Sequence, residues 1–570
     1  MSIISHYVTY IVLVGLLITS VDGAAHKECV SPLDQLNATL DGRLQKALPL
    51  AASCFSIPEG SQCAAIKAAL GSSYDRTNFY QGFEFIQGEA CSSDPSNQCL
   101  LNPVTLMAPT NSTCKQGSVS PKFIEITGAT DVQAVFSHAQ KFGTLLSIKN
   151  SGHDYAMRSS RPGSLAMWTR GLREQSFHAD FVPSGCSRGA VALSAVTIGA
   201  GVNMDEAISF AHNNGVLFAV GSGGSIGASG GWLLGGGHGL LSGTKGLAAD
   251  RVLEYAIVTP DGQVRMANRC TNQDLFWALR GGGSGAFGLV LTSTHLVERE
   301  SPVIGAVLAF PATAANVRPW VEILSNNMRE WALSGWGGSS STNYSILVNL
   351  NISADEARVA LSSAVEYARA QGGQAEVTTY ASFFDYYVDI INGTFAQPAM
   401  VGIAPMAAGR IIPEAVFQNS SMLARMVDGI MDIMSTGLSP TFLTTMPLLY
   451  ARSHPTQETS LHSSWYHSVW EIVVGGAWTS LSSLEERRAV VAQMKSITET
   501  LISVSPDGCA YSSEASPWLD DWAEQFWGQN YARLLEIKQT YDPTGLLSCW
   551  HCVGWNKSMP EYECISGLAP

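Results

Sequence analysis

The chain has 570 residues, of which 46% are hydrophobic and 14% are charged. This is more than one compact core uses, so we expect two or more domains. The formal net charge is −14 and the pI is about 5.3. Because the Lys and Arg residues form no basic cluster, this balance excludes a nucleic-acid partner.

The N-terminus carries an apolar run over residues 8–21, too short to span a bilayer, which the small residues Gly23, Ala24 and Ala25 follow. Although no Lys or Arg precedes the run, the pattern is typical of a signal peptide, which we place over residues 1–24. Asn-x-Ser/Thr sequons lie at Asn37, Asn111, Asn343, Asn351, Asn392, Asn419 and Asn556. Since only the secretory pathway would use them, we expect a secreted protein that carries N-glycans and has no membrane span in the mature chain.

The cysteines are unevenly distributed. They lie at Cys29, Cys54, Cys63, Cys91, Cys99, Cys114, Cys186, Cys270, Cys509, Cys549, Cys552 and Cys564. An even number in a secreted protein predicts disulfides, whose connectivity the sequence does not give. Cys549-Trp-His-Cys552 could instead be a redox pair or half of a zinc site. Structural bridging is favoured, because no second Cys-x-x-Cys is present and no helical pattern follows as in a thioredoxin-like motif.

Residues 25–115 form a cysteine-rich N-terminal extension with few periodic elements, and its function cannot be read. Over residues 116–300 short strands alternate with helices, which predicts one α+β domain. We expect strands at 123–126, 144–148, 191–199, 216–220 and 289–297, and a hairpin of 252–259 with 263–267. We expect helices behind a capping box at Thr130–Gln133, from Asn203 with Glu206 as its capping partner to Gly215, and over 272–280.

The second half of the chain has fewer glycines. Over residues 301–504 we expect strands at 304–310, 345–351 and 469–474 and a helix at 354–371. This predicts a second α+β domain that lays a substrate over a cofactor. Residues 505–570 close the chain and are helical and aromatic between Trp518 and Tyr541.

Two stretches carry the chemistry. Ser147–Tyr155 places His153 behind a glycine in a loop after a strand, where backbone can approach a flat ligand. Gly221–Gly239 has the glycine density of a phosphate cradle whose N–H groups point inward. Together they predict a bound flavin. The plainer alternatives are tight turns for the glycines, a solvated surface position for His153 and a hydrogen-bonding loop position for His238. No second ligand lies at zinc spacing from His153, so we expect no metal.

Two lookalike motifs are disfavoured by their context. Gly283–Gly288 matches G-x-G-x-x-G, but a helix precedes it and a strand follows, the reverse of a dinucleotide-binding turn. Gly223–Gly227 matches the G-x-S-x-G elbow of serine hydrolases, which must lead into a helix. The next residues, 227–239, are too rich in glycine for that, because each glycine costs about 1 kcal/mol inside a helix.

These residues resemble the berberine-bridge-enzyme-like FAD-linked oxidases of the vanillyl-alcohol-oxidase superfamily. The shared motifs occur in order at Ile148–Tyr155, Gly230–Gly239, Gly246–Asp250, Asp274–Gly283 and from Asn530 to Pro543. The resemblance covers residues 115–300 and 510–556. The cysteine-rich front is similar to secreted fungal members, including those described as isoamyl alcohol oxidases.

The resemblance implies an α+β fold in three parts. These are a two-part PCMH-type FAD-binding domain over 116–300, an α+β substrate domain with an antiparallel sheet over 301–504, and a C-terminal segment that returns to the FAD-binding domain. It also implies that His153 bonds the flavin 8α-methyl carbon, to which a neutral imidazole nitrogen can add. The other expected cofactor-binding residues are Lys149, Asn150, Ser151, Gly152, Asp154, Gly221, Ser222, Gly227, Gly230, Gly231, Gly235, Gly236, Gly237, His238, Gly239, Asp250, Asn530 and Tyr531.

The chain departs from the family at one position. Many members carry a second flavin link through a cysteine, and that position falls near Gly223, where no cysteine exists between Cys186 and Cys270. We therefore expect attachment through His153 only. The residue thought to gate oxygen in plant members falls near Ile226.

The resemblance implies an oxidase that removes a hydride from an alcohol, a sugar or a secondary metabolite to flavin N5, with oxygen as acceptor and hydrogen peroxide as product. Tyr155 resembles a family active-site tyrosine. A base should take the donor's proton; Glu471 is the candidate, followed by Tyr466 and Tyr450. The alternatives are an oxidative cyclisation in secondary metabolism and a secreted flavoprotein without turnover, and the substrate cannot be read from residues 301–504.

Overall fold

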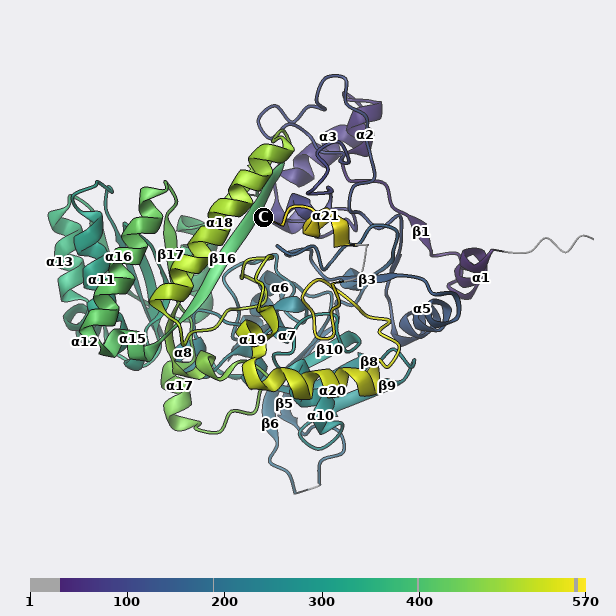
Figure 1. Ribbon diagram of the computed structural model, residues 1–570. Coiled ribbons are helices and arrows are strands. Elements are labelled where there is room, and N and C mark those ends of the chain that lie inside the picture. The colour runs from purple at the N-terminus through teal and green to yellow at the C-terminus, as the bar shows by residue number, and fades with distance from the viewer. Residues whose placement is uncertain (1–30, 188, 397–398, 558–561, 570) are drawn as a thin grey trace, which may run out of the picture.

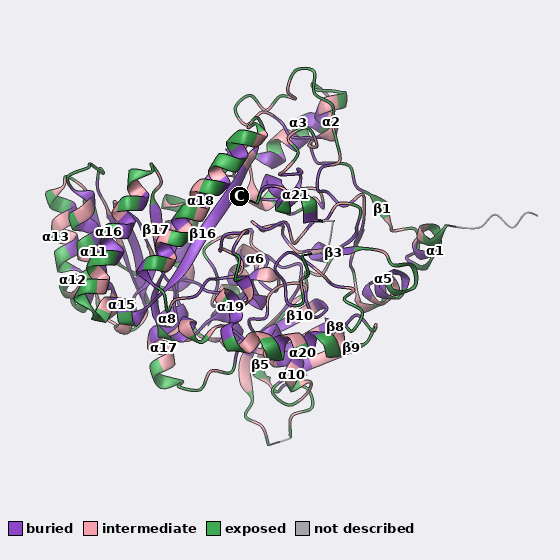
Figure 2. Cartoon of the chain, viewed as in Figure 1, coloured by how far each residue is buried: buried purple, intermediate pink, exposed green. Residues whose placement is uncertain are grey.

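The computed structural model describes residues 31–187, 189–396, 399–557 and 562–569. The expected signal peptide and Cys29 lie outside the described residues. Figure 1 shows a layered helix-and-sheet part at the left, beside a second part in which the N-terminal extension and the C-terminal segment flank smaller sheets. Strands such as β16 (Ile403–Pro413) are buried, as the purple in Figure 2 shows, whereas β5 (Gln175–Phe181), at the edge of its sheet, is partly exposed.

The first sheet carries the histidine loop. Its strands are β1 (Gln45–Lys46), β2 (Lys122–Glu125), β4 (Leu165–Trp168) and β3 (Leu146–Lys149), in that order. The last three are parallel, and β1 joins the N-terminal extension to them. Helix α5 (Ala129–Phe142) buries the predicted face of Val132, Val135 and Phe136 and ends at Gly143, whose φ is 66°.

The capping box predicted at Thr130–Gln133 is wrong. Helix α5 begins after Gly128, which makes no side-chain cap. The carboxylate of Asp131 instead accepts hydrogen bonds from the Thr127 N–H and the Arg43 side chain. Asp131 therefore contacts a residue just before the helix and Arg43 of the extension, in place of the cap that the pattern suggested.

The second sheet is antiparallel and completes the part formed by residues 116–300. Because the sequence predicts a cofactor there, we call this part the cofactor half. Its order is β5 (Gln175–Phe181), β6 (Leu193–Gly199), β10 (Leu289–Leu296), β8 (Val252–Val258) and β9 (Val264–Asn268). The predicted β8–β9 hairpin is confirmed. Helix α6 (Met204–Asn213) has the predicted capping box of Asn203 and Glu206. The strand expected at 216–220 is only β7 (Val216–Leu217), which pairs with β11 (Glu298–Arg299).

The third sheet is the frame of residues 301–504, for which the sequence predicts substrate binding. Its antiparallel order is β15 (Gln374–Tyr380), β12 (Val303–Ala309), β14 (Tyr344–Asn349), β13 (Gly337–Ser340), β17 (Pro440–Thr444), β18 (Ser468–Thr479) and β16 (Ile403–Pro413). Helices cover one face: α11 (Val317–Leu333), α12 (Ala354–Ala360), α13 (Ser362–Ala370), α16 (Ser420–Ser435) and α18 (Leu484–Val504). The single helix expected at 354–371 is broken at Leu361. The alternation of β18 turns Trp470 and Ile472 toward these helices and Glu471 toward the cofactor half.

Short helices complete the structure. They are α2 (Ala52–Ser56), α4 (Ser73–Arg76), α7 (Gly231–Leu234), α8 (Ser242–Lys245), α9 (Ala248–Arg251), α14 (Phe383–Tyr386), α15 (Glu414–Gln418), α17 (Leu448–Ser453), α19 (Trp522–Trp527) and α21 (Glu563–Ser566). Longer ones are α1 (Pro32–Thr39), α3 (Ser61–Leu70), α10 (Gln273–Leu279) and α20 (Tyr531–Tyr541). No helix among the described residues is both long and apolar enough for a bilayer.

Disulfides connect the ends of the chain to the body. The pairs are Cys54–Cys63, Cys91–Cys564, Cys99–Cys114, Cys186–Cys270 and Cys549–Cys552. Cys549 and Cys552 therefore bridge each other and provide no half of a zinc site. Cys91–Cys564 links the extension to the C-terminal segment across 473 residues of sequence.

Candidate cofactor cavity and active site

A cavity with roughly 1250 Å³ of empty space, part of it open to solvent, lies where four segments meet. These segments are the loop after β3, residues 226–234, residues 284–290 before and in β10, and two pieces of the C-terminal segment. We call Gly221–Gly239 the glycine belt, with residues 221–234 as its first half and 235–239 as its second. Its walls include Asn150, Ser151, Gly152, His153, Asp154, Arg158, Ile226, Gly227, Gly230, Gly231, Ser284, Gly285, Gly288, Tyr511, Ser513, Glu514, Leu547, Ser548 and Cys549.

Glycines at the cavity wall allow close approach of backbone and side chains. A Cβ at Gly227 would lie 1.5 Å from Asn150 Oδ1, so no other residue fits there. Gly152 has φ of 94°, a conformation that side chains rarely adopt. The walls thus combine small residues from two loops with a histidine, which suits a long, flat, phosphate-bearing cofactor such as FAD.

His153 enters this cavity from the loop after β3. Its Nε2 lies 2.8 Å from Ser225 Oγ, and the edge of Phe85 packs against the ring at 5.8 Å between centroids. Burial lowers the pKa of His153, and the nearby positive charges of Arg76 and Lys149 lower it further, to about 3. The imidazole is therefore neutral at physiological pH and keeps a nitrogen lone pair.

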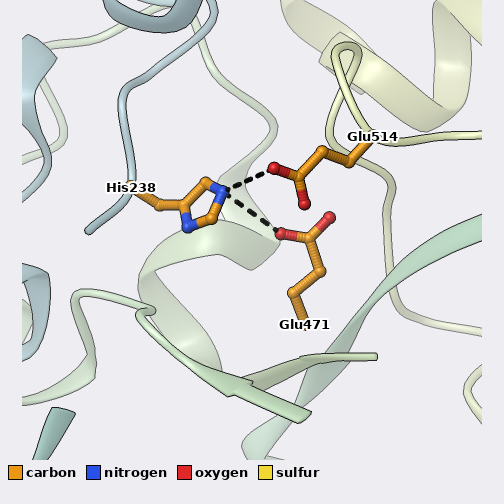
Figure 3. Close-up of side chains that lie close together, drawn as sticks. All are labelled: His238, Glu471 and Glu514. Atoms are coloured by element: carbon orange, nitrogen blue, oxygen red, sulfur yellow. Dashed lines mark hydrogen bonds and ion pairs between the residues drawn. The ribbon is translucent and has the colours of Figure 1, made fainter. Parts of the chain in front are cut away.

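A second histidine, His238, pairs with two glutamates from distant segments (Figure 3). Its Nε2 lies 3.3 Å from Glu514 Oε1 and 3.8 Å from Glu471 Oε2, while its Nδ1 lies 3.0 Å from Thr445 Oγ1. Burial alone would lower the pKa of His238, but Glu514 and Glu471 raise it to about 9. The ring is an imidazolium, and both of its N–H groups have an acceptor.

Glu471 and Glu514 differ in their surroundings. The side chain of Glu471 is fully buried, and neither carboxyl oxygen makes a hydrogen bond with the described residues. Burial, and secondarily the charge of Glu514, raises the pKa of Glu471 to about 8, so this carboxyl holds a proton at neutral pH. Glu514 is part of the cavity wall and its side chain is 26% exposed. Of the two, Glu514 is the one that a ligand in the cavity meets.

The side-chain types of this cluster are also those that bind transition metals. The ligand atoms of His238, Glu471 and Glu514 lie within 4.8 Å of one another. In the structure His238 and Glu514 share a hydrogen bond, whereas the carboxyl oxygens of Glu471 accept none from the described residues. Metal analysis of the purified protein distinguishes a metal site from an acid–base cluster.

The structure brings only part of the predicted cofactor-binding set to the cavity. Asn150, Ser151, Gly152, His153, Asp154, Gly227, Gly230 and Gly231 line it. Lys149, Gly221, Ser222, Gly235, Gly236, Gly237, His238, Gly239, Asp250, Asn530 and Tyr531 do not. The second half of the belt serves packing, because the carbonyls of Gly236 and Gly237 accept the N–H groups of Ala249 and Ala248 in α9.

The predicted catalytic residues also separate into groups. Tyr155 follows His153 by two residues and stacks on Phe85 at 4.3 Å, and Glu471 lies beside His238. Tyr466 instead donates a 2.7 Å hydrogen bond to Asp250. Tyr450 stacks on His454 at 4.0 Å.

Two residues of the site were not predicted from the sequence: Ser225, which contacts His153, and Glu514 of the cavity wall. Ser225 lies in the glycine belt but carries no motif of its own. Glu514 lies in Ala510–Ala515, where one acidic residue among small ones resembles an ordinary loop. Its partner His238 is 276 residues away in sequence, so no local pattern links them.

The sequence matches two family models, an FAD binding domain at residues 121–268 and a "Berberine and berberine like" segment at residues 510–549. It is 39% identical over 547 residues to the FAD-linked oxidoreductase cheF of Chaetomium globosum, which covers 94% of this chain and 88% of the relative. The chain belongs to the berberine-bridge-like FAD-linked oxidoreductases. It is therefore an FAD-dependent oxidoreductase.

Solved structures agree with the fold of this family. The VAO-type flavoprotein MtVAO615 of Myceliophthora thermophila C1 superposes with a TM-score of 0.80 at 26% identity and covers 94% of this chain and 96% of its own. The glucooligosaccharide oxidase of Acremonium strictum, described with a 6-S-cysteinyl, 8α-N1-histidyl FAD, has a TM-score of 0.61 at 17% identity and covers 76% of this chain and 92% of its own. The latter likeness is one of fold alone. The predicted α+β fold of the PCMH-type FAD-binding superfamily is confirmed.

Proposed function

We propose that this berberine-bridge-like oxidoreductase is a secreted oxidase that carries FAD bonded to His153 only. In this proposal it oxidises an alcohol, a sugar or a secondary metabolite and passes the electrons to oxygen, giving hydrogen peroxide. The observation that supports it best is the shared cavity: a neutral His153 and the carboxylate of Glu514 line the same space. Bound FAD would supply the hydride acceptor, and the chain would supply the proton acceptor.

The hydrogen bond of His153 favours one ring nitrogen for attachment. If the Nε2–H donates to Ser225 Oγ, the lone pair lies on Nδ1, to which no described residue donates a hydrogen bond. Nδ1 is the N1 position named for the Acremonium strictum oxidase. The cysteinyl link named there has no counterpart here, because Gly223 occupies the expected position and a Cβ on it would lie 2.7 Å from Ile226 Cδ1.

We assign the base to Glu514, with Glu471 as the protonated group behind it. Glu514 faces the cavity and can accept the proton of a donor hydroxyl, and its Oε1 lies 3.3 Å from Nε2 of His238. Glu471 already holds its proton at neutral pH. It can therefore exchange a proton with Glu514 through His238. Tyr155, stacked on Phe85, provides a hydroxyl near these acids.

Acid precipitation of the purified, secreted protein tests the attachment. The precipitate should stay yellow, and His153→Ala should release its FAD into the supernatant. The matched control is His178→Ala, which replaces a partly exposed histidine of β5 that lies outside the cavity wall. A white wild-type precipitate would refute the covalent link. Tryptic glycopeptides at the seven sequons, found after expression in a fungal host, would support secretion.

The oxidase activity is tested separately. Dithionite-reduced protein should regain its yellow colour in air, with peroxide as product, and a panel of alcohols, sugars and polyketide-type alcohols should bleach it without air. A flavin that stays reduced in air and that no donor bleaches would instead favour a flavoprotein without turnover. If the activity follows a stoichiometric metal that a chelator removes, the metal interpretation of His238, Glu471 and Glu514 replaces the acid–base one.

A further inference from the structure

A loop of the N-terminal extension lies directly against the segment that carries His153. We call residues 76–89 the support loop and residues 149–155 the histidine loop. Lys149 connects them: its Nζ donates to the carbonyls of Phe79 at 2.9 Å, Tyr80 at 2.8 Å and Gly82 at 2.5 Å. Burial lowers the pKa of Lys149 to about 7, but three carbonyl acceptors match the three N–H bonds of an ammonium group, so the side chain is fully used as an anchor.

The two loops also touch through their backbones. The Glu84 N–H donates to the Gly152 carbonyl at 3.3 Å. A Cβ on Gly152 would lie 3.0 Å from Lys149 Cε and 3.3 Å from the Phe83 Cα, so the glycine before His153 leaves no spare room. The position of the support loop therefore fixes the position of the residue that precedes the histidine.

Aromatic contacts extend this support to both sides of His153. Phe85 stacks on Tyr155 at 4.3 Å and sets its edge against His153 at 5.8 Å. Gln87 Nε2 donates to the Tyr155 carbonyl at 3.3 Å and to the Pro405 carbonyl at 2.7 Å. The support loop thus contacts the histidine loop before, at and after His153.

Charge reinforces the geometry. Arg76 is 2% exposed, and its guanidinium donates to the Glu84 carbonyl at 3.0 Å. Glu89, which accepts the Phe83 N–H at 3.1 Å, is the buried acid opposite Lys149. Arg76 and Lys149 both disfavour a proton on His153, which keeps the ring nucleophilic.

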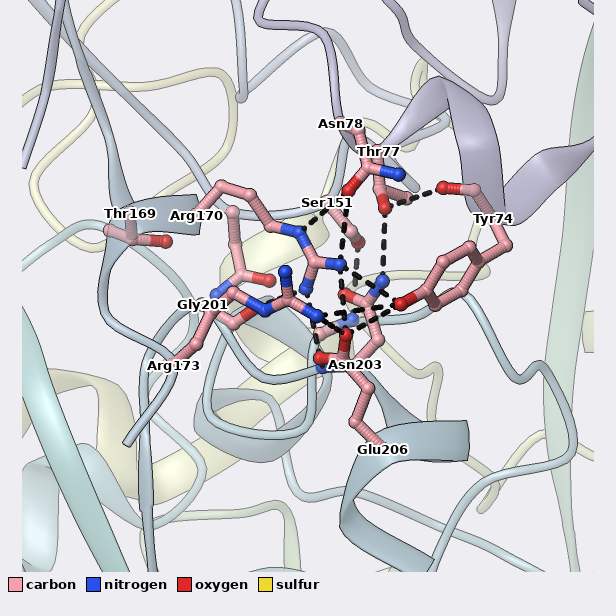
Figure 4. A network of polar contacts seen from close by, with 12 residues as sticks. Tyr74, Thr77, Asn78, Ser151, Thr169, Arg170, Arg173, Gly201, Asn203 and Glu206 are labelled. Atoms are coloured by element: carbon pink, nitrogen blue, oxygen red, sulfur yellow. Dashed lines mark hydrogen bonds and ion pairs between the residues drawn. The ribbon is translucent and has the colours of Figure 1, made fainter. Parts of the chain in front are cut away.

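A separate polar network connects the start of this region to the cofactor half (Figure 4). Tyr74 donates to Glu206 Oε1 at 2.7 Å, and Asn203 Nδ2 donates to Thr77 Oγ1 at 3.0 Å. Arg170 donates to Asn78 Oδ1 at 3.1 Å and to Glu206. Both ends of the support loop are therefore anchored, one by this network and the other by contacts with Tyr155 and Pro405.

We propose that the support loop, anchored by Lys149, positions His153 for covalent attachment of FAD, which makes the N-terminal extension part of the attachment machinery. This inference rests on the proposed covalent link. In that reaction an imidazole nitrogen bonds to the flavin 8α carbon, and one proton leaves that carbon and one leaves the other ring nitrogen, which faces Ser225. Two electrons pass through the flavin to oxygen, which takes up the two protons as hydrogen peroxide.

The test is the rate of attachment in variants of the full chain. Lys149→Met removes the charge and the three donors, and Lys149→Gln keeps two donors in a smaller side chain that the fold tolerates better. Both are produced in a riboflavin-limited host, mixed with FAD, and sampled over time for flavin fluorescence that survives denaturing electrophoresis. We expect attachment at least tenfold slower than in the wild type, with FAD still bound non-covalently and released by acid.

Arg487→Met is the matched control. Arg487 is also buried and also connects to the extension, donating to the carbonyls of Cys91 at 3.3 Å and Ser92 at 2.9 Å, but it does not contact the histidine loop. It should attach FAD at the wild-type rate. Wild-type attachment rates in either folded Lys149 variant would overturn the inference, and so would equal slowing in Arg487→Met. If the wild type itself holds no covalent FAD, the proposed function fails instead.

Discussion

Two histidines, the half-buried His153 and the buried His238, end in opposite states. Protein surrounds both rings, which by itself lowers the pKa of an imidazole. Desolvation, with further contributions from Arg76 and Lys149, lowers the pKa of His153 to about 3, whereas Glu514 and Glu471 outweigh desolvation and raise the pKa of His238 to about 9. The sign of the neighbouring charges, and not burial, decides between them.

This difference assigns different chemistry to the two rings. A neutral ring with one nitrogen turned to Ser225 suits bond formation at the other nitrogen. A charged ring that bridges two carboxyl groups suits proton handling. The same residue type in one cavity region can therefore serve as a nucleophile and as a proton carrier, depending on the segments that pack around it.

The largest effect is expected from the loss of the Glu514 carboxylate beside His238. Glu514→Gln removes the proposed base, and with any donor that bleaches the wild-type flavin we expect kcat to fall about 10²- to 10⁴-fold. Covalent FAD should remain, because His153 is unaffected. The control is Glu524→Gln, an exposed carboxylate of the same C-terminal segment. An unchanged kcat in Glu514→Gln would show that Glu514 is not the base.

A smaller effect is expected from the loss of the Ser225 hydroxyl beside His153. Ser225→Ala deletes the partner of Nε2, and a lost hydrogen bond of about 1 kcal/mol corresponds to attachment slowed by up to about tenfold. The measurement is the time course of acid-stable flavin after FAD is added. Ser435→Ala, at the exposed end of α16, is the control. Equal rates in both variants would show that the ring needs no partner at Nε2.

The third prediction concerns pH. Glu471 keeps its proton in the folded state up to about pH 8, whereas the unfolded chain loses it near its ordinary value of 4.5. Between these values the folded state binds more protons, so the free energy of unfolding falls as pH rises, by at most about 1.4 kcal/mol per pH unit. Glu471→Gln should flatten this fall in urea titrations between pH 5 and 8.

The part of the pH-dependent fall in the free energy of unfolding that comes from His238 should remain in Glu471→Gln. Its folded pKa is raised, so its contribution is complete below pH 6.5 and is lost as pH rises toward 9. A slope between pH 5 and 6.5 that is identical in the wild type and in Glu471→Gln would contradict the protonated state of Glu471.

The smallest expected effect is at Thr445, which accepts the other N–H of His238. Thr445→Val should lower the free energy of unfolding by about 1 kcal/mol, the value of one buried hydrogen bond. The two carboxyl groups should still keep His238 charged. Titration of the His238 ring signal by NMR checks this, and a pKa below 7 in Thr445→Val would give the hydroxyl the role assigned here to the glutamates.

Local patterns predicted the elements that depend on local rules. The capping box of Asn203 and Glu206, the hairpin of β8 and β9 and the histidine loop at the cavity all follow from neighbouring residues. The resemblance, and not the spacing, led to His153 as the attachment residue, and that role stays a prediction.

Long-range pairing explains what the sequence did not reveal. Lys149 lies in a cofactor motif, but the carbonyls of residues 79–82 draw its side chain to the other side of the loop. The proximity of Glu514 to His238 arises only when the C-terminal segment folds back onto the glycine belt. The second half of the belt is also rich in glycine, yet there Gly237 leaves room for Ala248 of α9, because a Cβ on Gly237 would lie 2.6 Å from the Ala248 Cβ. Composition alone cannot separate these uses.

Mass spectrometry of the tryptic peptide that contains His153 tests the central claim most directly. The account predicts that this peptide from wild-type protein carries the added mass of FAD, with fragment ions that place it on His153 and on no cysteine. An unmodified His153 peptide together with fully released FAD, or FAD on a different residue, would contradict it.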